Sequence, residues 1–146
     1  MYYSWLQDPI TLQLTRTDEP VTLDDCMQLQ QQYIIDDTIE TCIIQLKNST
    51  RQCIGDVNIF MHAYLEPYTC EIDVMIGDIQ YRKNGYGAEA CKLMMQYGIQ
   101  QHNLHTFIAK IASNNIGSIQ LFRKLGFNEI EYVGVFDEYI YEYRVK

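Results

Sequence analysis

The chain has few basic residues and no long apolar run. Its 146 residues include 11 Lys and Arg against 19 Asp and Glu, so the formal net charge is −8. Nucleic-acid and anionic-membrane binding usually require a basic surface, so this balance argues against both partners. No stretch approaches the roughly 20 apolar residues that a helix needs to cross a bilayer. The first residues also lack the basic and apolar regions of a signal peptide. We expect one domain, residues 1–146, with a single core.

Cysteines at metal-ligand spacing are also missing. No two of the five cysteines form a Cys-x-x-Cys pair, so we expect no metal site. Their odd number and apolar neighbours predict reduced thiols, as in the cytosol or nucleus, and we expect a cytoplasmic protein. Cys91, the cysteine nearest the loop described next, is expected to be a small packed side chain. The five are Cys26, Cys42, Cys53, Cys70 and Cys91.

The sequence does contain a basic, glycine-bearing loop between a strand and a helix. Residues 82–90 read Arg-Lys-Asn-Gly-Tyr-Gly-Ala-Glu-Ala, with a strand-like apolar run (72–76) before them and a helix-periodic run (90–97) after them. Gly85 and Gly87 allow the backbone to approach a ligand closely. Backbone N–H groups at a helix N-terminus, together with the helix dipole, favour an anion there. The expected ligand is a phosphate or a diphosphate.

Two familiar phosphate-binding loops fit these residues poorly. A Walker A loop requires a Lys-Ser/Thr pair after its glycines, which this chain lacks. A dinucleotide fingerprint agrees with the spacing of Gly85, Gly87 and Ala90, but it also needs an acidic residue about 20 positions later. No Asp or Glu occurs between Glu89 and Glu129. A dinucleotide-binding protein is therefore the disfavoured reading.

A third loop, Gln/Arg-x-x-Gly-x-Gly/Ala, is matched by Arg82, Gly85 and Gly87. A second segment, residues 115–127, reads Asn-Ile-Gly-Ser-Ile-Gln-Leu-Phe-Arg-Lys-Leu-Gly-Phe. The two segments occur in this order with one expected strand between them. Together they resemble the two hallmarks of the GNAT acetyltransferase superfamily.

Two more segments indicate which subgroup of this superfamily the chain resembles. Residues 54–60 (Ile-Gly-Asp-Val-Asn-Ile-Phe) and 71–76 (Glu-Ile-Asp-Val-Met-Ile) are similar to the eukaryotic N-acetyltransferase 9-like proteins. The resemblance covers about residues 2–143. It implies an acetyl-coenzyme A-dependent enzyme that transfers an acetyl group to a primary amine of a protein or peptide. The acidic balance of the chain is compatible with a basic peptide or amine, although most acidic proteins are simply soluble.

Periodicity predicts an α+β chain of the mixed α/β kind, in which helices cover a mixed sheet. Thr22 and Asp25 resemble a capping box, whereas Pro9 is expected to stop the first helix and Pro20 to close a polar loop. The central strand–helix–strand order predicts one parallel pair, and antiparallel pairs are expected elsewhere. Helices are expected at 2–7, 22–33, 86–101 and from Asn114 or Asn115 to Gly126, and strands at 39–46, 53–62, 69–77, 106–112, 127–133 and 135–143, with a turn at 47–52.

The resemblance implies a coenzyme site. In GNAT folds the sheet opens after the third of these strands, and the pantetheine arm of the coenzyme pairs with free backbone groups in the gap. The N–H of Ile76 or Gly77 is then the candidate that stabilises the oxyanion. Simpler interpretations are an unbroken strand, a solvated Lys83 and a plain helix cap at Asn115. The implied coenzyme-contacting residues are Met75, Ile76, Gly77, Arg82, Lys83, Asn84, Gly85, Tyr86, Gly87, Ala88, Asn115, Ser118 and Phe122.

The resemblance also implies a strand before the first helix. This chain begins at the residues that usually follow that strand. We therefore expect an unpaired edge on the strand at 39–46, in a shortened form or in one whose edge a partner covers.

Acetyl transfer to an amine needs a base for the attacking ammonium and an acid for the leaving thiolate. Glu71 and Asp73 lie two residues apart on a strand and point to one face, so they are the candidate catalytic bases. Glu71 matches the resembled family better, and the alternative is two ordinary surface acids; His62 is a weaker candidate. Phe122 stands where many GNAT enzymes carry Tyr, so either another group such as a nearby Tyr serves as the acid or the thiolate leaves without help.

Two functions therefore remain. The first is an acetyl-coenzyme A-dependent N-acetyltransferase. The second is a catalytically weak or inactive member that binds coenzyme A and acts through protein contacts, with a possible cytoskeletal partner. They share every binding residue and differ only in the base, the acid and the acceptor cleft.

Overall fold

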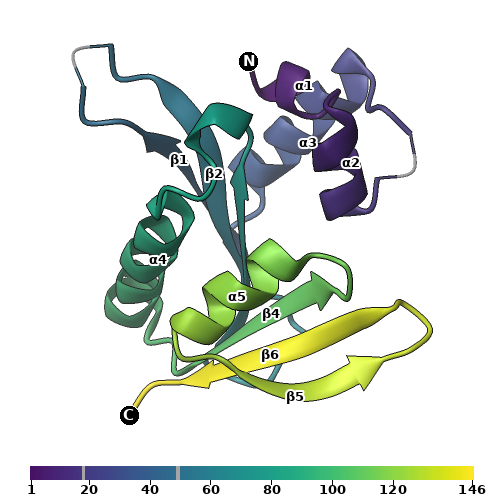
Figure 1. The fold of residues 1–146 in the computed structure, drawn as a ribbon. Helices are drawn as coiled ribbons and strands as arrows, with labels where there is room; N and C mark the ends of the chain where they lie inside the picture. Colours follow the sequence, from purple (N-terminus) through teal and green to yellow (C-terminus); the bar gives the residue numbers. More distant parts are fainter. Residues whose placement is uncertain (18, 49) are drawn as a thin grey trace.

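The computed structural model describes residues 1–17, 19–48 and 50–146. Strands among these residues form one mixed sheet in the order β1-β2-β3-β4-β6-β5 (Figure 1). Only β3 and β4 run parallel in the described sheet, and the other neighbours are antiparallel, as predicted. β1 is an edge strand, which confirms the expected unpaired edge within the described residues. The strands are β1 Ile39–Gln45, β2 Cys53–Phe60, β3 Thr69–Ile76, β4 Thr106–Ala112, β5 Asn128–Val133 and β6 Glu138–Arg144.

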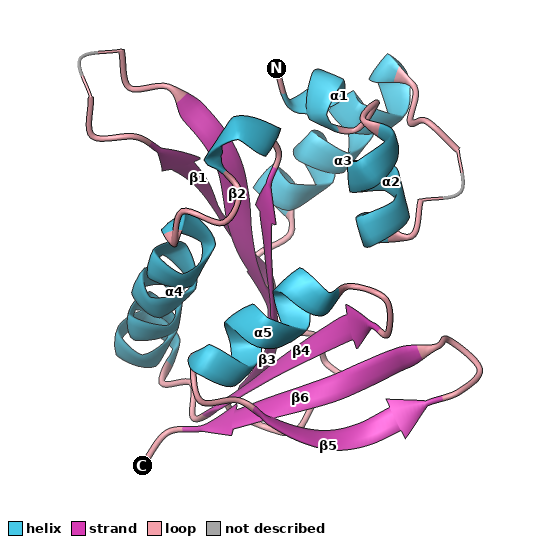
Figure 2. Cartoon of the chain, in the orientation of Figure 1, coloured by secondary structure: helices cyan, strands magenta, loops and turns pink. Residues whose placement is uncertain are grey.

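Helices lie in two groups beside this sheet. Figure 2 shows α1, α2 and α3 gathered together, apart from α4 and α5. A short 3-10 helix, η1, precedes α4. No helix in the described ranges is long and apolar enough to cross a membrane. The helices are α1 Tyr2–Trp5, α2 Pro9–Thr15, α3 Leu23–Ile35, η1 Ile79–Tyr81, α4 Tyr86–His102 and α5 Ile116–Lys124.

The prediction for Pro9 was wrong. Helix α1 already ends at Trp5, and Pro9 is the first residue of α2. Proline suits a first helical position, because its missing N–H would have no intrahelical acceptor there. The Asp8 side chain caps the new helix by accepting a hydrogen bond from the Thr11 N–H at 2.8 Å. Part of the predicted polar loop is thus helical, and its residue 18, like residue 49 of the predicted 47–52 turn, lies outside the described residues.

Local capping signals elsewhere were predicted correctly. Thr22 and Asp25 form the capping box of α3. Asn115, rather than Asn114, caps α5 by accepting a hydrogen bond from the Ser118 N–H at 3.1 Å. Both signals depend on residues three positions apart, so the sequence predicts them, although it left the choice between Asn114 and Asn115 open.

The main core lies between one face of the sheet and helix α4. Ile59 and Ile72 pack there with Cys91 and Met94 of α4, and all four are at most 2% exposed. Cys91 is therefore the packed side chain that was predicted. Since side chains alternate along a strand, the neighbouring residues of β2 and β3 point to the opposite face, toward α1 and α3.

Helix α1 is held against the end of β3 by a close contact. A Cβ added to Gly77 would lie 2.1 Å from Cδ2 of Trp5, so only glycine fits beneath this indole. We expect Gly77→Ala to lower the free energy of unfolding by about 1–3 kcal/mol, because Trp5 must move. Urea denaturation measures this effect.

Gly117→Ala is the matched control for that substitution. In the described part of the chain, no atom lies within 4 Å of a Cβ at this position, which belongs to α5. We expect this substitution to leave the free energy of unfolding unchanged or to raise it by up to about 1 kcal/mol, because Ala has a higher helix propensity than Gly. Equal effects of the two substitutions would contradict the packing role of Gly77.

Candidate functional site

Strands β3 and β4 pair only at one end. Their register joins Thr69–Glu71 to Thr106–Ile108, whereas β3 continues to Ile76 with β2 as its partner. The two ribbons diverge beyond this point (Figure 1). The predicted opening of the sheet is therefore present, and the interpretation as an unbroken ladder is excluded.

The register of β2 decides which backbone groups face the gap. The Gly77 N–H donates to the Ile54 carbonyl at 2.9 Å, which makes these two a hydrogen-bonded pair. In an antiparallel ladder such pairs alternate with pairs whose groups point away. Ile76 therefore directs its N–H and C=O toward the gap, and its carbonyl accepts from Nε of Arg82 at 2.8 Å.

This alternation corrects part of the predicted lining. Met75 and the N–H of Gly77 point to β2, whereas the Gly77 carbonyl accepts from Nη2 of Arg82 at 3.4 Å. Beyond the part of β3 that pairs with β4, the backbone groups on the gap side therefore belong to Val74 and Ile76. Of the two oxyanion candidates, only the Ile76 N–H points into the gap. The sequence could not decide between them, because the answer depends on pairing with a distant strand.

The glycine-bearing loop is held in a fixed turn. Lys83 and Gly85 have φ angles of 62° and 86°, in the left-handed region. The Asn84 side chain closes the turn by donating from Nδ2 to the carbonyls of Gln80 (3.3 Å) and Arg82 (3.0 Å). Lys83 is exposed. Such a turn can present successive N–H groups to an anion.

The loop leads directly into the N-terminus of α4. The first intrahelical hydrogen bond runs from the Glu89 N–H to the Gly85 carbonyl at 3.0 Å. The N–H groups of Tyr86, Gly87 and Ala88 therefore have no acceptor within the helix and lie at its positive end. A diphosphate fits this donor set, as the sequence predicted.

The Arg82 side chain does not lie with these donors. Its Nη2 donates to Oγ1 of Thr11 at 2.7 Å and lies 3.8 Å from Oδ2 of Asp8. With its bond to the Ile76 carbonyl, it fastens the start of α2 to the end of β3. The guanidinium therefore serves the fold beside the site, and a contact of Arg82 with the diphosphate stays a prediction.

The second hallmark is largely structural in this chain. The Asn115 side chain is the helix cap described above, as the simpler interpretation predicted. Phe122 is 2% exposed and packs against Phe127 with 5.0 Å between ring centroids. Its predicted contact with the coenzyme therefore does not involve an exposed ring. A Cβ on Gly87 would lie 3.1 Å from Leu121, so α4 and α5 meet closely beside the gap.

An acidic cluster lies on the opposite face of β2 and β3. Thr41, Asn58 and Asp73 are direct cross-strand neighbours and form one row. Asn58 donates from Nδ2 to Oδ1 of Asp73 at 2.7 Å and to Oδ2 of Asp56 at 3.2 Å. Tyr2 of α1 donates to the same oxygen of Asp56 at 3.4 Å. Sequence reasoning missed Asp56, although its alternation with buried Val57 and Ile59 was a signal.

The two candidate bases differ in their surroundings. Desolvation, together with the smaller effects of the Asp56 and Glu71 charges, raises the pKa of Asp73 to about 7, although the hydrogen bond from Asn58 lowers it. Asp73 is nevertheless exposed to solvent, although protein atoms surround its carboxylate closely enough to desolvate it. Glu71 instead contacts Nζ of Lys110 at 2.7 Å and the Tyr64 hydroxyl at 2.8 Å.

His62 and Arg16 interact with residues outside the gap and the acidic cluster. His62 stacks between the rings of Phe60 and Tyr64, at 5.7 and 5.0 Å. The Arg16 guanidinium donates to the carbonyls of Phe136 and Asp137, which ties α2 to the β5–β6 turn. Within the described ranges, no three His, Cys, Asp or Glu side chains are arranged to hold a metal.

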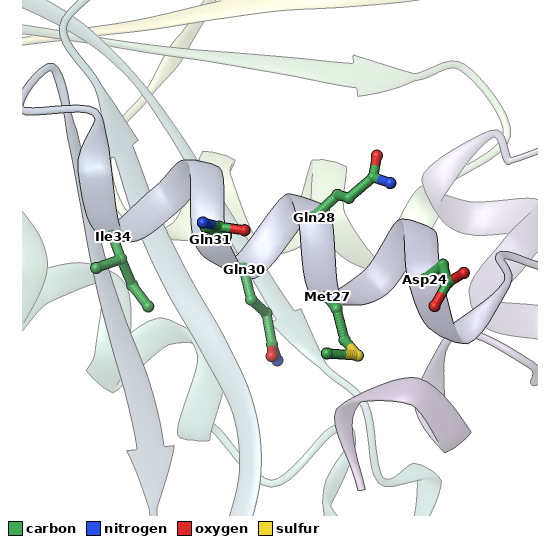
Figure 3. A pocket seen from close by; sticks show the side chains of 6 residues that line it. All are labelled: Asp24, Met27, Gln28, Gln30, Gln31 and Ile34. Atoms are coloured by element: carbon green, nitrogen blue, oxygen red, sulfur yellow. The ribbon is translucent and has the colours of Figure 1, made fainter.

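A separate pocket lies on helix α3 (Figure 3). None of its lining residues belongs to the loop, the gap or the acidic cluster, so it is not part of this site. They are Asp24, Met27, Gln28, Gln30, Gln31 and Ile34.

Comparison of the sequence with known proteins identifies the family. A family profile described as Acetyltransferase (GNAT) domain matches residues 1–128. An N-acetyltransferase 9-like protein of Nematostella vectensis is 34% identical over 94% of this chain and 73% of its own length. The alpha/beta-tubulin-N-acetyltransferase 9 of Mus musculus is 33% identical over 94% of this chain, which spans 60% of that relative.

Structural comparison gives the same fold at lower identity. A domain from Methanocaldococcus jannaschii superposes with a TM-score of 0.81 and 22% identity, covering 98% of this chain and 89% of its own. Spermidine N-acetyltransferase from Vibrio cholerae, solved with CoA and spermine, gives a TM-score of 0.76 at 16% identity and covers 96% and 84%.

Proposed function

Because the chain belongs to the GNAT acetyltransferase family, we propose that it is an acetyl-coenzyme A-dependent N-acetyltransferase acting on a primary amine of a protein or peptide. One observation carries this proposal. The Ile76 N–H is directed into an open gap between β3 and β4, and that gap adjoins a loop with free donors at the start of α4. Solved relatives of this fold contain coenzyme A, which supports acetyl-coenzyme A as the co-substrate.

The residues have distinct roles in binding. Acetyl-coenzyme A supplies an activated thioester. The N–H groups of Tyr86, Gly87 and Ala88 would hold its diphosphate, with Lys83 adding positive charge from the exposed turn. The gap-side groups of Val74 and Ile76 would pair with its arm. The Ile76 N–H would also donate to the oxygen on which negative charge develops during transfer.

We propose Asp73 rather than Glu71 as the general base. Glu71 already forms an ion pair with Lys110, whereas the raised pKa of Asp73 suits proton transfer near neutral pH. At about 3.3 Å per residue, Asp73 lies about 10 Å along the strand from Ile76, so the proton would pass through a water molecule. This preference reverses the one that the sequence favoured.

No protein acid has been assigned to the leaving thiolate. Phe122 has no hydroxyl and is buried in the core, so the thiolate would take its proton from water. This feature favours the second candidate function, a weak or inactive member that binds coenzyme A and acts through protein contacts. The two functions differ in turnover and not in coenzyme affinity.

We further propose that the acceptor is a protein amine of the kind that tubulin offers, with a cytoskeletal partner. Relatives that this chain resembles carry the name alpha/beta-tubulin-N-acetyltransferase 9. We also propose a cytoplasmic location, because the cysteines among the described residues are all free, as in a reducing compartment.

Calorimetry followed by an acetylation assay tests the proposal. Purified protein is titrated with acetyl-coenzyme A, with NAD in a parallel cell, and we expect saturable binding of acetyl-coenzyme A alone. Peptides with the N-terminal sequences of α- and β-tubulin are then incubated with the complex, and mass spectrometry measures acetyl incorporation. Binding without transfer would support the non-catalytic function, and no binding by folded protein would contradict both.

A further inference from the structure

The acidic cluster has more hydrogen-bond acceptors than donors. Asp56 and Asn58 are only 3% and 4% exposed. Within the described residues, Oδ1 of Asp56, Oδ1 of Asn58 and Oγ1 of Thr41 are buried without a hydrogen-bond partner. Buried polar atoms are rarely left unpaired in native proteins, so each of these three requires an explanation.

The donors available inside the cluster are already used. The Asn58 side-chain amide donates hydrogen bonds to both carboxylates, Asp56 and Asp73. The nearby cations are paired elsewhere, since Lys110 contacts Glu71 and Arg82 contacts Asp8. In the described part of the chain, neither Asp56 nor Asp73 has a cationic partner. The cluster therefore lacks both N–H donors and positive charge.

A protonated primary amine supplies what the cluster lacks. An ammonium group carries one positive charge and three donors, which matches the three unpaired oxygens. A divalent metal fits less well, because only two carboxylates converge and no larger ligand group is arranged among the described residues. Water would satisfy individual atoms but would leave the negative charge unbalanced whenever both carboxylates are ionised.

The cluster is also placed where an acceptor amine is needed. Asp73 is open to solvent and lies two residues beyond Glu71, where pairing between β3 and β4 ends. Ile76 follows three residues later along the same strand. Asp56 lies beneath the Tyr2 hydroxyl, whose 3.4 Å contact is a long one for a hydrogen bond. Movement of the short helix α1 would open this side.

We propose that Asp56, Asn58 and Asp73 form the subsite that receives the protonated acceptor amine, so that this protein selects cationic primary amines. This inference rests on the proposed acetyltransferase function and deepens it. Asp56, whose cross-strand neighbour Met75 adjoins Ile76, and Asn58 position the ammonium, and Asp73 receives its proton through a water molecule. The proton then leaves to solvent through Asp73, and the neutral amine attacks.

Such a subsite makes the fold less stable as pH rises. Burial raises the pKa of Asp56, so the folded state binds more protons than the unfolded chain between the two pKa values, and stability falls as pH rises through that window. The titratable groups around it are Tyr2, Tyr33, Asp73 and Glu71, with Cys26 beside Tyr2. Burial raises the pKa of Tyr33 to about 12 and that of Tyr2 further, so both tyrosines stay neutral there.

Ligand binding to Asp56→Asn is the decisive experiment. Coenzyme A-saturated protein is titrated with n-butylammonium, with n-pentanol as a neutral probe and tetramethylammonium as a cation without donors, at constant ionic strength set by NaCl. NMR shifts report binding. We expect the wild type to bind only n-butylammonium and Asp56→Asn to bind it at least 10-fold more weakly. Asp24→Asn, an exposed change of equal charge on α3, should bind like the wild type.

Thermal melts separate a binding role from a structural one. Asp56→Asn keeps an oxygen for Asn58 and Tyr2 but removes the buried charge, so we expect a higher Tm than the wild type at pH 8 and a smaller difference at pH 5. A lower Tm at pH 8 would show that the carboxylate serves the fold and would overturn the proposal. Equal affinity for tetramethylammonium, or no binding of n-butylammonium by the wild type, would also overturn it.

The outcomes distinguish this inference from the proposed function. Coenzyme A binding and acetyl transfer are measured separately from n-butylammonium binding. Transfer to tubulin peptides without n-butylammonium binding would refute the subsite alone. In an active protein, Asp56→Asn should raise KM for the acceptor at least 10-fold and leave KM for acetyl-coenzyme A unchanged.

Discussion

Gly87→Glu is expected to reduce the affinity for acetyl-coenzyme A at least 100-fold, which corresponds to about 2.7 kcal/mol. The substitution places a carboxylate in the first turn of α4, where free N–H groups and the helix dipole favour an anionic ligand. A Cβ there already lies 3.1 Å from Leu121 and 3.8 Å from Ile76, so the longer side chain must enter the space beside the gap. Calorimetry measures the affinity, and circular dichroism verifies the fold.

Lys83→Glu tests the same loop without a packing change. Lys83 is exposed, so reversing its charge should weaken coenzyme binding several-fold and leave the melting temperature unaltered. Lys124→Glu makes the same charge change in the last turn of α5 and serves as the matched control. Micromolar affinity retained by folded Gly87→Glu would refute the assignment of this loop to the diphosphate.

Asp73→Asn is expected to lower kcat by about 10²–10⁴-fold, the range for loss of a general base. Affinity for acetyl-coenzyme A should not change, because Asp73 lies on the face of β3 opposite the core and α4. In the wild type, the raised pKa predicts that kcat/KM increases as pH rises through about 7, where the carboxylate becomes deprotonated. Asp73→Asn should lose this pH dependence, as a stopped assay of acetylated peptide can measure.

Glu71→Gln provides the comparison on the same strand. It breaks the ion pair with Lys110, a pair whose side chains are 17% and 40% exposed. We expect less than a 10-fold change in kcat and a stability loss of at most about 1 kcal/mol, typical of partly exposed pairs. A larger loss of kcat from Glu71→Gln than from Asp73→Asn would return the role of base to Glu71.

Local signals in the sequence were sufficient for much of the site. The loop at 82–88 and the caps at Thr22 and Asn115 depend on residues a few positions apart, and both were predicted correctly in position. The opening of the sheet came from family resemblance, and the pairing of β3 with β4 confirms it. Pro9 was misread because its neighbourhood fits both a helix stop and a helix start.

The sequence could not predict where individual side chains point. Arg82 matches the motif, yet its guanidinium contacts Thr11, 71 positions earlier in the chain. Phe122 likewise lies within the second hallmark segment, and its side chain is part of the core. A motif fixes which residue types occur in order, but the partner of a long side chain depends on which distant element packs beside it.

The sequence by itself determined the family, the order of the strands and the glycine-bearing loop at the start of α4. Only the tertiary structure decided that Ile76, and not Gly77, offers its N–H to the gap, and that Asp56 and Asn58 lie beside Asp73. The physical reason is strand register. Backbone groups and side chains alternate in direction along a strand, so a single residue of offset between β2 and β3 reverses which of them face the site.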